Sequence, residues 1–232
     1  MRIPHHPFVA DRFRVAAAVA ALVAGRLPVA VPRPVAGGPP AMECHVRLPG
    51  RRPQPAEAGP SLAADLAASL AALHAVPLAD ARAAGVVPDF WAGFLELAER
   101  ELPPEARDTG MRTAFALARD GAEALPAVLV HHDLHPANML VDGAPARLVG
   151  IIDFADVTIA DPHWDFRHLG DMGAGFLEAV VTAYEAGTGR RLSRARIGRL
   201  ADSRRGIDRA KAMLLRRHAR IDGCAAAPAC PS

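Results

Sequence analysis

The sequence predicts an α+β fold that is mainly helical and contains a small β element. Apolar residues recur at helical spacing through the first half of the chain, and short apolar runs of strand length follow between residues 127 and 152. A helical pattern then returns after Pro162. With 51% hydrophobic and 22% charged residues over 232 positions, the chain has enough apolar material for a core, which argues against global disorder.

Helices are expected over residues 8–24, 61–75, 90–100 and 105–123. The second of these is the clearest, because its leucines are spaced so that they line one helical face: Leu62, Leu66, Leu70 and Leu73. Residues 28–60 are dense in Pro and Gly, and we interpret them as a connector that could contain extended segments at 29–35 and 42–48.

Three short strands are expected at residues 127–131, 138–142 and 148–152. The last two are separated by Asp142-Gly143, which has the chemistry of a hairpin turn. After Pro162 the pattern predicts helix as far as Ile221, followed by a frayed tail.

Charge and cysteine content narrow the function class. The formal net charge of +2 does not predict nucleic-acid binding, and no stretch approaches transmembrane length. The stretch from Arg190 to Arg220 contains twelve basic residues and only two acidic ones. We favour a solvated helical face over a site for an anionic partner as the explanation. The three cysteines lack paired spacing, so a reducing cytoplasm is the simplest compartment.

The N-terminal segment imitates a targeting signal. Arg12 and Arg14 precede the apolar run 15–24, as a basic region precedes the apolar core of a signal peptide. The run is short and rich in alanine, which is only weakly apolar. We therefore favour an Ala-rich buried helix over a signal peptide.

The most informative residues lie around the predicted strands. Asp133 follows the first strand in a loop stiffened by Pro136, Asn138 comes five residues later, and Asp153 ends the third strand. If the first and third strands are neighbours, their ends bring all three side chains to one point. Carboxylate and amide oxygens suit a hard cation such as Mg²⁺, and phosphoryl transfer needs a carboxylate near the attacking hydroxyl and metal ligands beside it.

Other readings of the polar residues differ in strength. His131, His132, Asp133 and His135 could bind zinc, but no later motif completes such a site and Asn138 would have no role. We interpret Asp142 as a turn residue, Asp161 as a helix N-cap and His74 as a structural histidine, and Asp156 is left between a turn residue and a substrate contact.

The string from His131 to Asn138, followed by Ile152-Asp153-Phe154, resembles the catalytic loop and metal-binding motif of protein kinases. It resembles more closely the aminoglycoside phosphotransferase and choline kinase group. That resemblance implies a protein-kinase-like fold, Asp133 as catalytic base, and Asn138 and Asp153 as metal ligands. Asp161-Pro162-x-x-Asp165 is similar to a downstream element of the group, and the likeness implies that Asp165, with His131, supports the catalytic loop.

The flanking segments are similar to the group as well. Leu73-His74-x-x-Pro77 and Arg47-Leu-Pro-Gly50 resemble its segments, whereas Ala155 stands where the group usually has Gly. The resemblance implies that residues 1–47 form a shortened nucleotide-binding lobe and residues 48–232 form the catalytic lobe. It also implies that Arg2 contacts phosphate and that Cys44 and His45 lie at the hinge near adenine.

Two parts of a kinase small lobe do not appear in the sequence. A glycine-rich hairpin is not found before Arg2, and the helix position expected to carry a Glu falls at Val15 or Ala16. Either upstream residues are omitted from the recorded start, or the chain is a degenerate kinase that binds ligands without efficient transfer. The predicted function is transfer of the ATP γ-phosphate to a hydroxyl of a small molecule with Mg²⁺, without nucleic-acid or membrane partners.

Overall fold

The computed structural model describes residues 7–33 and 45–225. The described chain divides into two compact units. The first contains the described residues up to Asp89 together with 123–201, and the second contains 90–122 with the described residues from 202 onward. The predicted boundary between residues 47 and 48 follows a different criterion and stays a prediction.

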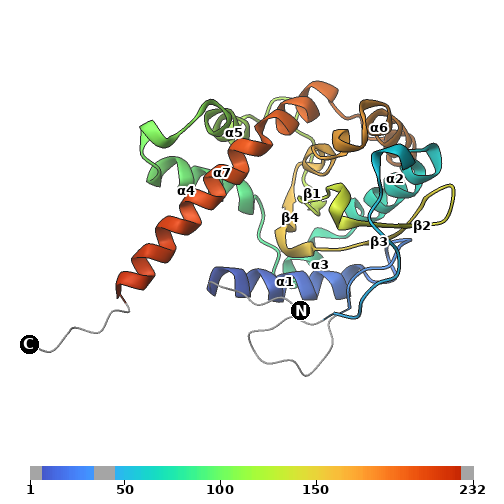
Figure 1. Ribbon diagram of the computed structural model, residues 1–232, viewed down its shortest axis with the longest axis horizontal. Coiled ribbons are helices and arrows are strands. Elements are labelled where there is room, and N and C mark those ends of the chain that lie inside the picture. Colours follow the sequence, from blue (N-terminus) through green and yellow to red (C-terminus); the bar gives the residue numbers. More distant parts are fainter. Residues whose placement is uncertain (1–6, 34–44, 226–232) are drawn as a thin grey trace, which may run out of the picture. The chain divides into compact units, whose positions relative to one another are not determined.

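The first unit is built on helices and two small sheets (Figure 1). Its helices are α1 (Pro7–Val23), α2 (Pro60–His74), α3 (Leu78–Ala83), α6 (Ala174–Thr188) and the first residues of α7 (Arg194–Ala225). Helices α2 and α6 pack against each other, and α2 also contacts strands of both sheets. The predicted leucine face of α2 is confirmed, since all four leucines are buried.

Each sheet has two antiparallel strands. Strands β2 (Met139–Asp142) and β3 (Arg147–Ile151) form the predicted hairpin, in which the Gly143 N–H donates to Asp142 Oδ1 at 2.8 Å. Strand β1 (Val128–Val130) pairs with β4 (Thr158–Ala160). The expectation that the first and third strands are neighbours is therefore wrong. Strand β4 was missed because it is three residues long and lies between turn-forming aspartates.

The region after Pro162 is also more broken than the sequence predicted. Two 3₁₀ turns, η5 (Pro162–Phe166) and η6 (Leu169–Met172), precede α6, and α6 and α7 are separate helices. The break follows from Gly189, which caps α6 in a left-handed conformation with φ of 71°. A β-branched or bulky residue at this position would be strained, whereas Gly adopts the conformation freely.

The second unit is helical. It contains α4 (Phe90–Glu101), the turn η2 (Pro104–Ala106), α5 (Thr109–Arg119) and the remainder of α7. The single helix expected over 105–123 is divided because Asp108 caps α5, its side chain accepting a hydrogen bond from the Met111 N–H at 2.8 Å. Trp91 of α4 is buried, and Lys211 Nζ lies 4.3 Å from its ring centroid.

Helix α1 confirms the interpretation of the N-terminal segment as a buried Ala-rich helix. Val15, Ala16, Val19 and Ala20 are all buried. In the parts of the chain that the structure describes, none of the helices combines the length and apolar character of a membrane span.

Candidate active site

The loop after β1 carries the residues that the sequence singled out. The His131 and His132 N–H groups donate to the two oxygens of the Asp165 carboxylate, at 3.0 and 2.6 Å. His132 has a left-handed backbone with φ of 68°, a conformation that costs about 1–3 kcal/mol in a non-glycine residue and persists where surrounding contacts fix it. Asp165 therefore determines where the chain turns out of β1 toward Asp133.

His131 links this loop to the segment that carries Asp153. Its Nε2 donates to the Ile152 carbonyl at 2.9 Å, and its Nδ1 accepts the Asp133 N–H at 3.3 Å. Its ring also packs against Phe154, with ring centroids 4.9 Å apart. Both ring nitrogens are therefore occupied by backbone groups, which is the geometry of a structural histidine and not of a zinc ligand.

Asp133 lies at the surface of the loop with its side chain about one-third exposed. Asn138 Nδ2 donates to the Asp133 carbonyl at 2.8 Å and to its carboxylate at 3.2 Å. His135 Nε2 and His168 Nε2 lie 3.5 and 3.7 Å from the two carboxylate oxygens. Burial and the charge of Asp156 raise the pKa of Asp133, and the nearby His135, His131 and Arg167 oppose that shift.

Asn138 and Asp153 come together on one side of a cavity. Asn138 ends the turn η3 (Pro136–Asn138) before β2, and Asp153 follows β3 by two residues, so the hairpin places both at the same end. The Ile152 N–H donates to the Asn138 carbonyl at 2.9 Å, and both Asn138 and Asp153 line the cavity. Their oxygens are the hard donors that Mg²⁺ prefers. Over the described residues, no group of three or more His, Cys, Asp and Glu side chains has the arrangement of a metal site.

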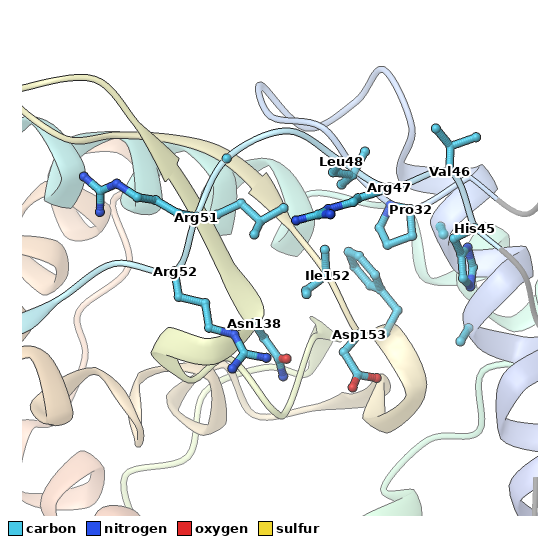
Figure 2. A pocket seen from close by; sticks show the side chains of 15 residues that line it. Pro32, His45, Val46, Arg47, Leu48, Arg51, Arg52, Asn138, Ile152 and Asp153 are labelled. Atoms are coloured by element: carbon cyan, nitrogen blue, oxygen red, sulfur yellow. The ribbon is translucent and has the colours of Figure 1, made fainter. Parts of the chain in front are cut away.

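The cavity has a volume of about 760 Å³ and lies within the first unit (Figure 2). Besides Asn138 and Asp153 it is lined by His45, Ile152 and Phe154, by alanines of α1, and by the segment 46–52. Gly50 makes the turn in that segment, with φ of 104° and no room for a side chain: a Cβ would lie 2.9 Å from the Val149 side chain. Of the predicted nucleotide-contacting residues, His45 lines the cavity, while Arg2 and Cys44 lie outside the described residues.

Three arginines in that segment give the cavity a positive wall that the sequence reading did not identify. Arg47, Arg51 and Arg52 all line the cavity. Arg51 is held by Glu57 through a bidentate ion pair, and in Figure 2 its side chain points away from Asn138. Arg52 points toward the part of the cavity lined by Asn138 (Figure 2). Adjacent arginines are visible in the sequence, but only the fold shows that they face the cavity.

Arg12, which the sequence analysis considered only as part of a basic N-terminal region, also contacts the site. Its side chain extends from α1 to the turn after Asp153, where Nε donates to the Ala155 carbonyl at 2.8 Å and Nη2 to the Val157 carbonyl at 2.5 Å. Because 143 and 145 residues separate these partners in the chain, no local pattern could have indicated the contact.

Asp165 is the centre of a buried network that also includes α2 and α6. His74 Nε2 donates to Asp165 Oδ2 at 3.0 Å, and the Tyr184 hydroxyl lies 2.7 Å from His74 Nδ1. Because the ionised carboxylate can only accept, His74 Nε2 carries the proton of the hydrogen bond to Asp165. The expectation that His74 is a structural histidine is confirmed, since it is buried with both ring nitrogens hydrogen-bonded.

Asp161 has a structural setting as expected. Its side chain caps η5 by accepting the His163 N–H at 3.2 Å, and it forms a buried ion pair with Arg196 at 2.5 Å. Several other arginines of the basic stretch are also ion-paired, among them Arg194 with Glu178 and Glu185. These pairs fit the interpretation of that stretch as a helical face.

The hairpin that brings Asn138 and Asp153 together, and the loop after β1 that Asp165 holds, lie in a protein-kinase-like phosphotransferase fold. The model of the phosphotransferase enzyme family matches residues 1–198, so the chain belongs to this family. No curated protein sequence matches the chain.

Solved structures show the same fold. APH(2″)-IIia, solved as a complex with GDP and kanamycin, is 22% identical with a TM-score of 0.74, and the match covers 94% of this chain and 80% of that one. Macrolide 2′-phosphotransferase type I is 25% identical, with a TM-score of 0.70 and coverage of 92% and 82%. Macrolide 2′-phosphotransferase MphH from Brachybacterium faecium, as the apoenzyme, is 24% identical, with a TM-score of 0.70 and coverage of 100% and 84%.

Proposed function

We propose that this protein transfers the γ-phosphate of ATP to a hydroxyl group of a small molecule. The observation that carries the proposal is the meeting of Asp133, Asn138 and the Asp153 segment at one end of the β2–β3 hairpin, beside a cavity of about 760 Å³. Membership of a phosphotransferase family, and structural neighbours solved with GDP, ADP or ATP, support it.

In this proposal the three residues divide the work of transfer between them. Asp133 orients the acceptor hydroxyl and takes its proton, and the Asn138 amide holds the Asp133 carboxylate in place. Asn138 and Asp153 would hold Mg²⁺, which supplies charge stabilisation to the phosphate oxygens when bound. The backbone near Cys44 and His45 would meet the base of the nucleotide, and Arg2 would contact its phosphates.

The charge of the cavity bears on the ligands. Arg51 is paired with Glu57, so Arg47 and Arg52 against the Asp153 carboxylate leave this wall with a positive balance. That balance suits the phosphates of a nucleotide and disfavours a polycation beside them. The structural neighbours act on aminoglycosides and macrolides by name. For this chain we favour an acceptor that is not a polycation, such as a macrolide or a neutral sugar, over an aminoglycoside.

A transfer assay tests the proposed function directly. Purified protein is incubated with Mg²⁺ and γ-labelled ATP or GTP and with a panel of acceptors: kanamycin, erythromycin and neutral sugars. We expect label in one acceptor and a mass gain of one phosphate, dependent on Mg²⁺. Nucleotide binding without transfer to any acceptor would instead support a degenerate, non-catalytic kinase-fold protein, and no binding of any nucleotide would refute the proposal.

Arg52 provides a first prediction. A charge-assisted hydrogen bond contributes about 1.5–3 kcal/mol, so Arg52→Gln is expected to raise the Kd for ATP by about tenfold or more. The Kd is measured by isothermal titration calorimetry, with Arg82→Gln as the matched control because Arg82 is exposed on α3 and does not line the cavity. An unchanged Kd for ATP with a raised KM for the acceptor would show that Arg52 faces the acceptor instead.

A further inference from the structure

Helix α1 supplies a buried cation to the segment that carries Asp153. Arg12 is only 7% exposed, although arginine is among the residues that are rarely buried without a specific partner. Val15 and Ala16, one turn further along α1, are buried and apolar. Among the α1 side chains that the structure describes, Arg12 is the buried charged one.

Two of the partners of Arg12 are backbone carbonyls on either side of Asp156, and the charge of the Asp156 carboxylate also acts on the guanidinium. Ala155 O and Val157 O each accept one hydrogen bond from the fork of the guanidinium, at 2.8 and 2.5 Å. Helix α1 packs against this same turn, η4 (Phe154–Asp156). A planar fork that donates in two fixed directions defines both carbonyl positions, which a flexible ammonium group cannot do.

The turn that Arg12 contacts is strained, and one of its internal hydrogen bonds is long. Asp153 has a left-handed backbone with φ of 66°, which a non-glycine residue adopts at a cost of about 1–3 kcal/mol. Within the turn, the Asp153 carboxylate accepts the Ala155 N–H at 3.4 Å, near the limit for a hydrogen bond. The conformation of Asp153 therefore depends on contacts from outside the turn.

The same helix also forms part of the cavity wall, through Ala16 and Ala20. Residues one to two turns after Arg12 thus face the cavity that Asp153 lines, while Arg12 itself holds the backbone behind Asp153. A shift of α1 would therefore change both the cavity wall and the direction of the Asp153 carboxylate.

We propose that Arg12 is a positioning residue that fixes the Asp153 turn and thereby sets the affinity of the site for the metal–nucleotide complex. This inference rests on the proposed function, because it assigns Asp153 to the metal. Arg12 takes no part in the chemistry and touches neither metal nor nucleotide. Its effect is transmitted through the two carbonyls of the turn.

The test compares Arg12→Lys and Arg12→Met with Arg14→Met, which removes an exposed arginine from the same helix. Partners in the outer shell of a metal site typically contribute about 10–100-fold to metal affinity. We expect both Arg12 variants to weaken Mn²⁺ binding to the ATP complex by at least about tenfold, measured by electron paramagnetic resonance. Binding of ATP without metal should change by less than about twofold, since Arg12 does not line the cavity. Arg14→Met should match the wild type in both measurements.

The outcomes separate this inference from the proposed function. If wild-type protein binds no ATP or no metal in its presence, the proposed function fails first. If the wild type binds both and folded Arg12→Lys retains wild-type Mn²⁺ affinity, the positioning role is refuted. A thermal melt of each variant shows whether it folds, and if neither Arg12 variant folds, Arg12 is a structural residue and the proposal is overturned.

Discussion

Replacing Asp133 with Asn is expected to lower kcat for phosphate transfer by about 10²–10⁴-fold, the range that general acid–base catalysis contributes. The amide keeps the size of the side chain and can still accept from Asn138 Nδ2, but it cannot take a proton from the acceptor hydroxyl. The Kd for ATP should stay within about twofold, because Asp133 does not line the cavity. Steady-state kinetics and calorimetry on the same preparation measure both quantities.

Asp142→Asn is the matched control for this variant. Asp142 lies at the exposed end of β2, does not line the cavity, and accepts the Gly143 N–H in the hairpin turn. Its kcat should equal that of the wild type. A folded Asp133→Asn protein that retains more than about a tenth of wild-type kcat would contradict the assignment of Asp133 as the base.

The parts of the fold that could be predicted are those that depend on residues close together in the sequence. The leucine face of α2 and the β2–β3 hairpin follow from spacing and turn chemistry, which act over a few positions. The pairing of β1 with β4 could not be predicted in the same way. It is a contact between segments about 30 residues apart, and the partner strand is too short to show a period.

The residues of the candidate site also fall into those that a local sequence pattern reveals and those that only the fold reveals. Asp133, Asn138 and Asp153 were found because a motif places them at fixed spacing in the sequence. Arg12 and Arg52 were missed because each acts on a segment that is distant in the chain, so their importance depends on which face of the fold they reach.

Asp165 is the residue whose replacement we expect to affect stability most. Its carboxylate is fully buried and accepts from His74 Nε2 and from the His131 and His132 N–H groups. Asp165→Asn puts an NH₂ group opposite at least one of these donors. Removing one partner of a buried charged network costs about 3–5 kcal/mol in the free energy of unfolding, whereas exposed Asp80→Asn on α3 should cost less than about 1 kcal/mol.

The pH dependence of stability gives an independent check on this network. Burial acts to raise the pKa of Asp165, but the hydrogen bond and charge of His74, with contributions from His131, outweigh it and hold the pKa below its ordinary value. A carboxylate with a depressed pKa in the folded state contributes stability that is complete above its unfolded pKa, about 4, and is lost as the pH falls through the folded value. Urea unfolding of the wild type should therefore show a stability that falls as the pH is lowered below about 4, and the fall should be shallower in Asp165→Asn. Two results would contradict this role: a parallel loss of stability in both proteins as the pH falls, or a loss of less than about 1 kcal/mol in the variant at neutral pH. In either case the Asp165 carboxylate would not be what holds the loop after β1, and another contact would have to position Asp133.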